Sequence, residues 1–365
     1  MDKMLNTQTP NTLPAPADLL CFSHLNWDFV FQRPQHIMTR LAKTYTVYFI
    51  EEPTWHHHPD TYEIVNDRSV NVVKFRMSKS VEIPLQIRQR LLLDKLMKDR
   101  SIKKHLAWYY TPMAMEFSHH LQSDLTIYDC MDELSAFKFA PPTLKQNESL
   151  LLKKAGLVFT GGHSLYEAKK RSHHNIYPFP SSIDKAHFLQ PRNGMPQPED
   201  QQNIPAKRIG FYGVIDERFD IRLVAEVAAQ RPDWQLVLIG PVVKIEESEL
   251  PRLGNIHYLG GKTYDELPVY LSGWDIAFIP FEKNESTKYI SPTKTPEYLA
   301  AGKPVISSSI TDVVNPYAVK NLVHIADNST DFIKAAEKIF AATPAEHSSW
   351  LERTDEFLSA ISWDN

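Results

Sequence analysis

The sequence predicts an α/β protein made of two Rossmann-like domains, each a doubly wound parallel sheet, that face each other across a cleft. Its 365 residues are enough for two ordinary domains, each with its own core. Short apolar runs that are typical of buried parallel strands alternate with helical patterns in both halves. One break, residues 190–206, carries several prolines and many amides without periodicity, which is typical of a linker.

These features predict the following division of the chain: a flexible lead (1–16), an N-terminal domain (17–190), a linker (191–206), a C-terminal domain (207–343) and a C-terminal helical segment (344–365). For that last segment, packing back onto the first domain is one arrangement to test. In the first half we expect strands at 19–23, 46–51, 70–75, 107–110, 125–130, 156–160 and 175–179, and helices at 35–43, 87–105, 143–155 and 164–171.

The second half repeats the same rhythm. We expect strands at 208–214, 235–239, 256–259, 275–281, 304–308 and 322–325, and helices at 221–229, 265–272, 292–301, 331–341 and 345–362. Ligands of such sheets bind beyond the carboxyl ends of the strands, so a cleft between the two domains is the expected site.

Composition excludes several classes of protein. A hydrophobic share of 42%, a charged share of 23% and a net charge of −4 are typical of a globular protein and give no indication of nucleic-acid binding. Cys21 and Cys130 lie in or beside apolar runs and indicate buried thiols, without a disulfide framework. The first residues lack the apolar region of a signal peptide, and no run is long enough to span a bilayer, so a cytoplasmic protein is expected.

The most informative segment is 275–308, which predicts a strand, a polar loop, a short helix and another strand. Ser291 is expected as the N-cap, Pro292 as the first helical residue, and Gly302 as the left-handed residue after the helix. Lys294 and Glu297 would share a helix face, where the lysine can bind a phosphate and the glutamate the hydroxyls of a ribose. The alternative is an ordinary exposed ion pair on a surface helix.

The run SPTKTPEYLAAGKPVISS resembles the donor-binding element of the group 1 (family-four-like) glycosyltransferases of the GT-B fold, including bacterial polysaccharide and teichuronic-acid-type transferases. The resemblance implies that Glu297, at the place of the second of the family's two glutamates, binds the ribose of a nucleotide sugar, and Tyr289 stands where the family has the first. It further implies a donor site that includes Ser291, Thr293, Lys294 and the turn glycines Gly213, Gly240, Gly260 and Gly261. The family's arginine and lysine for the pyrophosphate have only Arg218 as a counterpart, so we assign the phosphate to Lys294.

The first half supplies further candidates at the carboxyl ends of its strands. Asp132 follows the strand at 125–130 and is our first choice for a general base; an N-cap for the next helix is the alternative. His36 is the second catalytic candidate. The other candidates for contact with acceptor or sugar are Gln32, Arg33, Asp129, Gly162 and His163, for which helix capping, a surface arginine or a tight turn are the alternatives.

We therefore expect a metal-independent hexosyltransferase without a cofactor, which uses a nucleotide sugar (a UDP-sugar favoured) and a glycan or lipid-linked acceptor in bacterial surface polysaccharide synthesis. The basic helix expected at 87–105 could lie on an anionic membrane surface, or simply cover the core. The tract His56–His58 is expected in a solvated loop, with no metal. Alternatives are a non-catalytic nucleotide-sugar-binding protein and a GT-B epimerase or hydrolase, and the sequence leaves retention or inversion of the anomeric configuration open.

Overall fold

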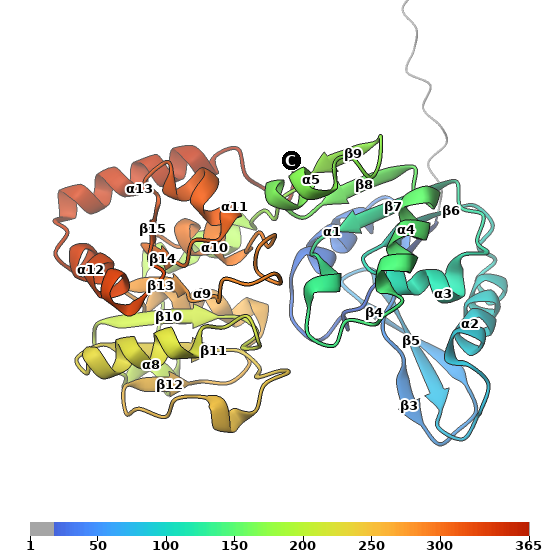
Figure 1. Ribbon diagram of the computed structural model, residues 1–365, viewed down its shortest axis with the longest axis horizontal. Helices are drawn as coiled ribbons and strands as arrows, with labels where there is room; N and C mark the ends of the chain where they lie inside the picture. Colours follow the sequence, from blue (N-terminus) through green and yellow to red (C-terminus); the bar gives the residue numbers. More distant parts are fainter. Residues whose placement is uncertain (1–17, 365) are drawn as a thin grey trace, which may run out of the picture.

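A computed structural model describes residues 18–364, which form two α/β units, each built on its own twisted sheet (Figure 1). The predicted fold class of two Rossmann-like parallel-sheet units is confirmed. The predicted lead 1–16 lies outside the described residues.

The first unit has a nine-stranded sheet in the order β3-β5-β2-β1-β6-β7-β8-β9, with β4 paired to β5. All these pairs are parallel except β4–β5. Its strands are β1 (Asp18–Phe22), β2 (Thr46–Ile50), β3 (Thr54–His56), β4 (Thr61–Asp67), β5 (Val70–Ser78), β6 (His105–Tyr109), β7 (Leu125–Cys130), β8 (Leu157–Thr160) and β9 (Ile176–Pro178). Its helices are α1 (Arg33–Leu41), α2 (Leu85–Asp99), α3 (Met115–Ser118), α4 (Leu144–Lys154) and α5 (His163–Lys169).

The second unit has a six-stranded parallel sheet in the order β12-β11-β10-β13-β14-β15. Its strands are β10 (Arg208–Tyr212), β11 (Gln235–Ile239), β12 (Ile256–Tyr258), β13 (Ile276–Ile279), β14 (Val305–Ser307) and β15 (Val323–Ile325). The helices that follow β9 are α6 (Lys185–Leu189), α7 (Glu199–Gln202), α8 (Ile221–Gln230), α9 (Leu267–Ser272), α10 (Lys294–Ala300), α11 (Thr311–Val313), α12 (Ser329–Phe340) and α13 (Pro344–Leu358).

Two parts of the first unit differ from the prediction. Strands β3 and β4 were not predicted; most of their residues are exposed or only half-buried because they lie at the sheet edge, so they lack a continuous apolar run. The helix predicted at 87–105 ends at Asp99, because Ser101 adopts a left-handed φ of 55° that an α-helix cannot contain. His105 instead opens β6 and is buried.

The predicted linker is mostly ordered and packs on the second unit. It contains a 3₁₀ turn (Gln190–Asn193) and α7, and the Trp274 indole donates a hydrogen bond of 2.9 Å to the buried Gln201 side chain. Ile183 and Phe188 already belong to the core of the second unit. The chain therefore crosses between the units soon after β9, earlier than the boundary predicted at 190.

The C-terminal helix α13 also packs on the second unit, and not on the first. Leu358 is fully buried in the core of the second unit, and Phe357 stacks edge-on against Tyr317 at 5.3 Å. Beyond α13 the chain does return to the first unit, where Trp363 enters a core cluster and Asp364 pairs with Arg40 at 2.8 Å. The Trp363 amide donates to the Ile183 carbonyl at 3.3 Å, so the two crossings lie side by side.

Candidate functional site

A cavity of about 550 Å³ lies between the carboxyl ends of the second sheet and the loop that follows β1. The first unit contributes residues 28–32 to its wall. The second unit contributes the turns after β10 and β11, the segment 261–267, and Thr293, Lys294 and Glu297. The cavity therefore occupies the place where parallel α/β sheets bind ligands.

Glu297 lies on α10 with its side chain buried at 5% exposure. The Tyr212 hydroxyl, at the end of β10, donates a hydrogen bond of 2.5 Å to its Oε2. Within residues 18–364 the other carboxylate oxygen has no hydrogen-bond partner. Burial raises the pKa of Glu297, although the hydrogen bond from Tyr212 and the charge of Lys294 both favour the ionised form. One oxygen is thus held by the protein, and the other is free for a ligand.

Lys294 is the first residue of α10, and its side chain lies against Gly213 in the turn after β10. A side-chain carbon at Gly213, whose φ is 141°, would lie 2.3 Å from Lys294 Cε, so only glycine lets the lysine pass. Burial and the nearby charge of Arg218 lower the pKa of Lys294. Among the described residues no carboxylate lies within ion-pair distance of its amine, which makes Lys294 a cation that can accept an anionic ligand.

Gly240 keeps the neighbouring turn equally narrow. A side-chain carbon there would lie 1.8 Å from the Gly213 carbonyl oxygen, and φ is 144°. The Gly240 amide donates to the Gly260 carbonyl at 2.9 Å, which ties the turn after β11 to the 260–263 segment. Gly213, Gly240 and Gly261 line the cavity. Gly260 does not line it, but its carbonyl accepts the hydrogen bond from Gly240.

Arg218 lies in the turn between β10 and α8, and it lines the cavity together with Lys294. Its guanidinium forms three hydrogen bonds to Asp216, two through Nε at 2.9 and 3.1 Å and one through Nη2 at 2.6 Å. Sequence reasoning passed over Arg218 in favour of Lys294 because the register of this turn was unknown. The structure brings both cations to one wall.

A second, smaller cavity of about 80 Å³ contains Asp132 together with Arg33, Ser181 and Ser291. Gln32, Arg218, Thr293 and Lys294 line both cavities, so the two adjoin. Burial raises the pKa of Asp132 to about 6, and the charge of Arg218 is the largest influence in the opposite direction. A carboxylate with a pKa near neutrality is suited to accept a proton.

His36 is not at either cavity. Its ring stacks on Trp363 at 4.9 Å and meets Phe31 and Tyr264 edge-on. Burial lowers the pKa of His36 to about 3. The prediction of a catalytic His36 is therefore wrong: the ring is a neutral part of an aromatic cluster that closes the junction between the units.

Arg33 and Asp129 also have a structural role. They form a fully buried ion pair with three hydrogen bonds between 2.8 and 3.1 Å, and Arg33 also donates to the Phe179 carbonyl at 2.6 Å. Such a pair is strongly destabilised when one partner is removed. Arg33 reaches the second cavity, but Asp129 is enclosed and unavailable to an acceptor.

Three other predicted residues lie between the units without lining either cavity. Tyr289 packs against the core of the first unit. A side-chain carbon at Gly162 would lie 2.0 Å from Asp312 Oδ2, and the same carboxylate accepts from the Ser164 amide at 2.9 Å, so an aspartate of the second unit caps α5. His163 is exposed at this contact.

The start of α10 also differs from the prediction. Its N-cap is Thr293, with helical φ and ψ and no side-chain cap, and not Ser291. Ser291 and Pro292 belong to the loop before the helix and line the second cavity. Gly302 has the predicted left-handed φ, 73°.

Comparisons with known proteins agree with this geometry. Residues 206–342 match the family described as glycosyl transferases group 1. The chain is also 25% identical, over 292 residues, to the putative teichuronic acid biosynthesis glycosyltransferase TuaH of Bacillus subtilis strain 168, with 73% of this chain and 71% of that protein covered. Residues 206–342 thus belong to the group 1 glycosyltransferases, and the chain is a distant homologue of TuaH.

Solved structures establish the GT-B fold of this glycosyltransferase. The sucrose-phosphate synthase of Thermosynechococcus elongatus superposes with a TM-score of 0.73 at 15% identity, covering 95% of both chains. HepE of Anabaena, solved in complex with UDP and glucose, gives a TM-score of 0.66 at 12% identity, covering 94% of this chain and 95% of HepE. These identities show a shared architecture only.

Two further observations bear on the other predictions. Among residues 18–364 no group of three or more His, Cys, Asp or Glu side chains is arranged to hold a metal ion. None of the helices in the same range is long and apolar enough to cross a membrane.

Proposed function

We propose that this glycosyltransferase transfers a hexose from a nucleotide-diphosphate sugar, preferably a UDP-sugar, to a glycan or lipid-linked acceptor. The observation that carries the proposal is the cation Lys294, which has no carboxylate partner among residues 18–364 and lies beside Glu297 at the carboxyl ends of the second sheet. A cation and a carboxylate in one cavity match the two ends of a nucleoside diphosphate. HepE, which shares the fold, is solved with UDP and glucose, and this supports the choice of donor.

In this proposal the free oxygen of Glu297 accepts hydrogen bonds from the ribose. Lys294 and Arg218 take the charge of the departing diphosphate, which is why we propose that transfer needs no metal. Ser291 and Thr293 lie beside the phosphate, and Gln32 faces both cavities. Asp132 is the group placed to take a proton from the acceptor hydroxyl.

Relatives support the proposed setting, synthesis of a bacterial surface polysaccharide, through the teichuronic acid assignment of TuaH. We further propose a cytoplasmic location with contact to a membrane surface through α2. Ile87 and Leu91, one helical turn apart on that helix, are 50% and 61% exposed. The neighbouring residues Arg88 and Leu92 are buried, so the apolar surface available for such contact is narrow.

The test is a thermal-shift screen of the wild-type protein with UDP-, GDP-, ADP- and CMP-sugars. A bound donor at a hundredfold excess over its Kd should stabilise the fold by about 2.7 kcal/mol. We expect Glu297→Ala to abolish the shift. Glu266→Ala is the matched control, because Glu266 lines the same cavity. Its carboxylate already accepts hydrogen bonds from the hydroxyl of Thr263 at 2.6 Å and from the amide of Thr263 at 2.8 Å.

An unchanged shift in Glu297→Ala would remove Glu297 from the donor site, and a wild-type chain that no nucleotide stabilises would contradict the proposal. Product analysis then separates the alternatives. A hydrolase or an epimerase turns over donor without acceptor, and a binding protein shows no turnover with any acceptor. Transfer that continues in excess EDTA would support metal independence.

We expect Tyr212→Phe to weaken UDP binding at neutral pH by about tenfold, because a hydrogen bond to a charged group contributes roughly 1.5–3 kcal/mol. The Tyr212 hydroxyl stabilises the ionised Glu297, so its loss raises the pKa of Glu297 further. Binding should therefore recover as the pH is raised. Calorimetry of UDP binding across the pH range measures this, and Tyr264→Phe is the control because its hydroxyl, at the same cavity, has no partner among the described residues.

A further inference from the structure

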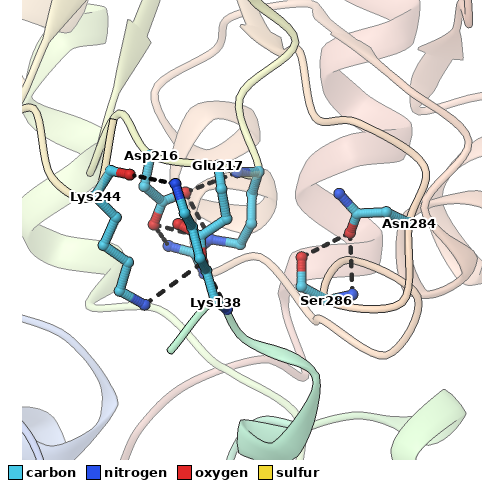
Figure 2. A network of polar contacts seen from close by, with 7 residues as sticks. Lys138, Asp216, Glu217, Lys244, Asn284 and Ser286 are labelled. Atoms are coloured by element: carbon cyan, nitrogen blue, oxygen red, sulfur yellow. Dashed lines mark hydrogen bonds and ion pairs between the residues drawn. The ribbon is translucent and has the colours of Figure 1, made fainter. Parts of the chain in front are cut away.

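A short segment of the first unit, Phe137 and Lys138, reaches across the cleft and contacts the second unit. We call these two residues the clasp. They follow the 3₁₀ turn Leu134–Ala136, on the same loop as Asp132. In Figure 2 Lys138 lies between Lys244 and Glu217. Its amide donates to Glu217 Oε1 at 3.3 Å, and its amine donates to the Lys244 carbonyl at 3.1 Å.

Glu217 joins both sides of this contact. Its Oε1 accepts from the clasp and also lies 3.5 Å from the Lys244 amine. Glu217 stands between Asp216 and Arg218 in the sequence. A contact that fixes Glu217 therefore also restricts the turn that carries Arg218, the arginine that lines the cavity.

The clasp touches Arg218 directly through the ring of Phe137. The guanidinium carbon of Arg218 lies 5.3 Å from the centre of that ring, within the range of a cation–π contact. Asp216 holds the guanidinium through three hydrogen bonds. The direction of the Arg218 side chain is therefore set from the second unit by a carboxylate and from the first unit by an aromatic ring.

We propose that Phe137 and Lys138 are positioning residues that hold Arg218 against the diphosphate of the donor. This inference rests on the proposed function and extends it to residues outside both cavities. The loop that carries the proposed base Asp132 thereby also orients a cation for the leaving group. Both the deprotonation of the acceptor by Asp132 and the orientation of Arg218 therefore require contact between the two units.

The experiment compares the affinities for UDP and UMP by calorimetry, because the second phosphate is what Arg218 would bind. We expect Phe137→Ala and Glu217→Ala to lower the preference for UDP over UMP by about tenfold, with little change in UMP affinity. Phe139→Ala is the control: Phe139 lies on the same loop and is 77% exposed, and its ring contacts the Lys138 amine at 5.1 Å but, among residues 18–364, neither Arg218 nor Glu217. In an Arg218→Ala background, Phe137→Ala should have no further effect on the preference.

A second measurement needs no ligand. Without nucleotide, hydrogen exchange of the 216–219 turn should be faster in Phe137→Ala than in Phe139→Ala. Equal exchange in the two variants, or a wild-type UDP preference in Phe137→Ala, overturns the inference and leaves the proposed function standing. A wild-type chain that binds neither UDP nor UMP overturns both.

Discussion

Asp132→Asn should lower kcat by about 10²–10⁴-fold, the contribution expected of a positioned general base. Asparagine keeps the size of the side chain but cannot take a proton from an acceptor hydroxyl. UDP binding should change little, because Asp132 lies in the smaller cavity beside the cations and not in the wall of the larger one. Steady-state kinetics with donor and acceptor, together with UDP calorimetry, separate the two effects.

The pH profile gives an independent check. Asp132 must be ionised to act, and its pKa is about 6, so kcat at saturating donor should fall as the pH drops below about 6. Asp28→Asn is the control: Asp28 lines the larger cavity, and its carboxylate pairs with Lys74 at 2.8 Å. An Asp132→Asn enzyme with wild-type kcat would show that the acceptor is deprotonated by another group.

Lys294→Met should lower kcat by about 10²–10³-fold, the loss typical of removing one group that stabilises developing charge. The same change should leave the stability of the unliganded protein unchanged or raise it, because it removes a largely enclosed charge without a carboxylate partner. A loss of activity together with an intact or higher melting temperature is the combined result that supports a role in binding.

Lys262→Met provides the comparison for Lys294→Met. Lys262 lines the same cavity, but its amine is already paired with Asp200 at 2.6 Å. If both variants lost activity equally, the general positive charge of the cavity, and not the position of Lys294, would be responsible. If Lys294→Met simply unfolded the protein, the lysine would be structural.

The placement of Lys294 and Glu297 could be predicted from the sequence because both lie on one short helix between two buried strands. Local spacing decides such cases: three residues apart on a helix means one face. The remaining site residues depend on contacts that the chain order does not reveal. Arg218 lines the cavity with its guanidinium held by Asp216, and Tyr212 meets Glu297 across 85 residues of sequence.

Predictions at the junction between the units were the least successful. His36, Asp129 and Tyr289 carry functional groups, but aromatic rings, an arginine or the core of the opposite unit enclose them. A local pattern cannot distinguish a side chain that faces a cavity from one that faces another unit. The edge strands β3 and β4 were missed for a related reason, since half-exposed strands lack a continuous apolar run.

The paired crossings of the chain at Ile183 and Trp363 restrict how this enzyme can move. We expect two adjacent connections to act as a hinge whose axis passes through them, so that opening would be a rotation with that edge as its pivot. Displacements grow with distance from the pivot, and the residues beside it, including His36 stacked on Trp363, move least. Pairs of spectroscopic labels placed across the two units near the pivot should therefore report almost no change in distance when UDP binds. Pairs placed on the side of the cleft farthest from the pivot should report the largest change.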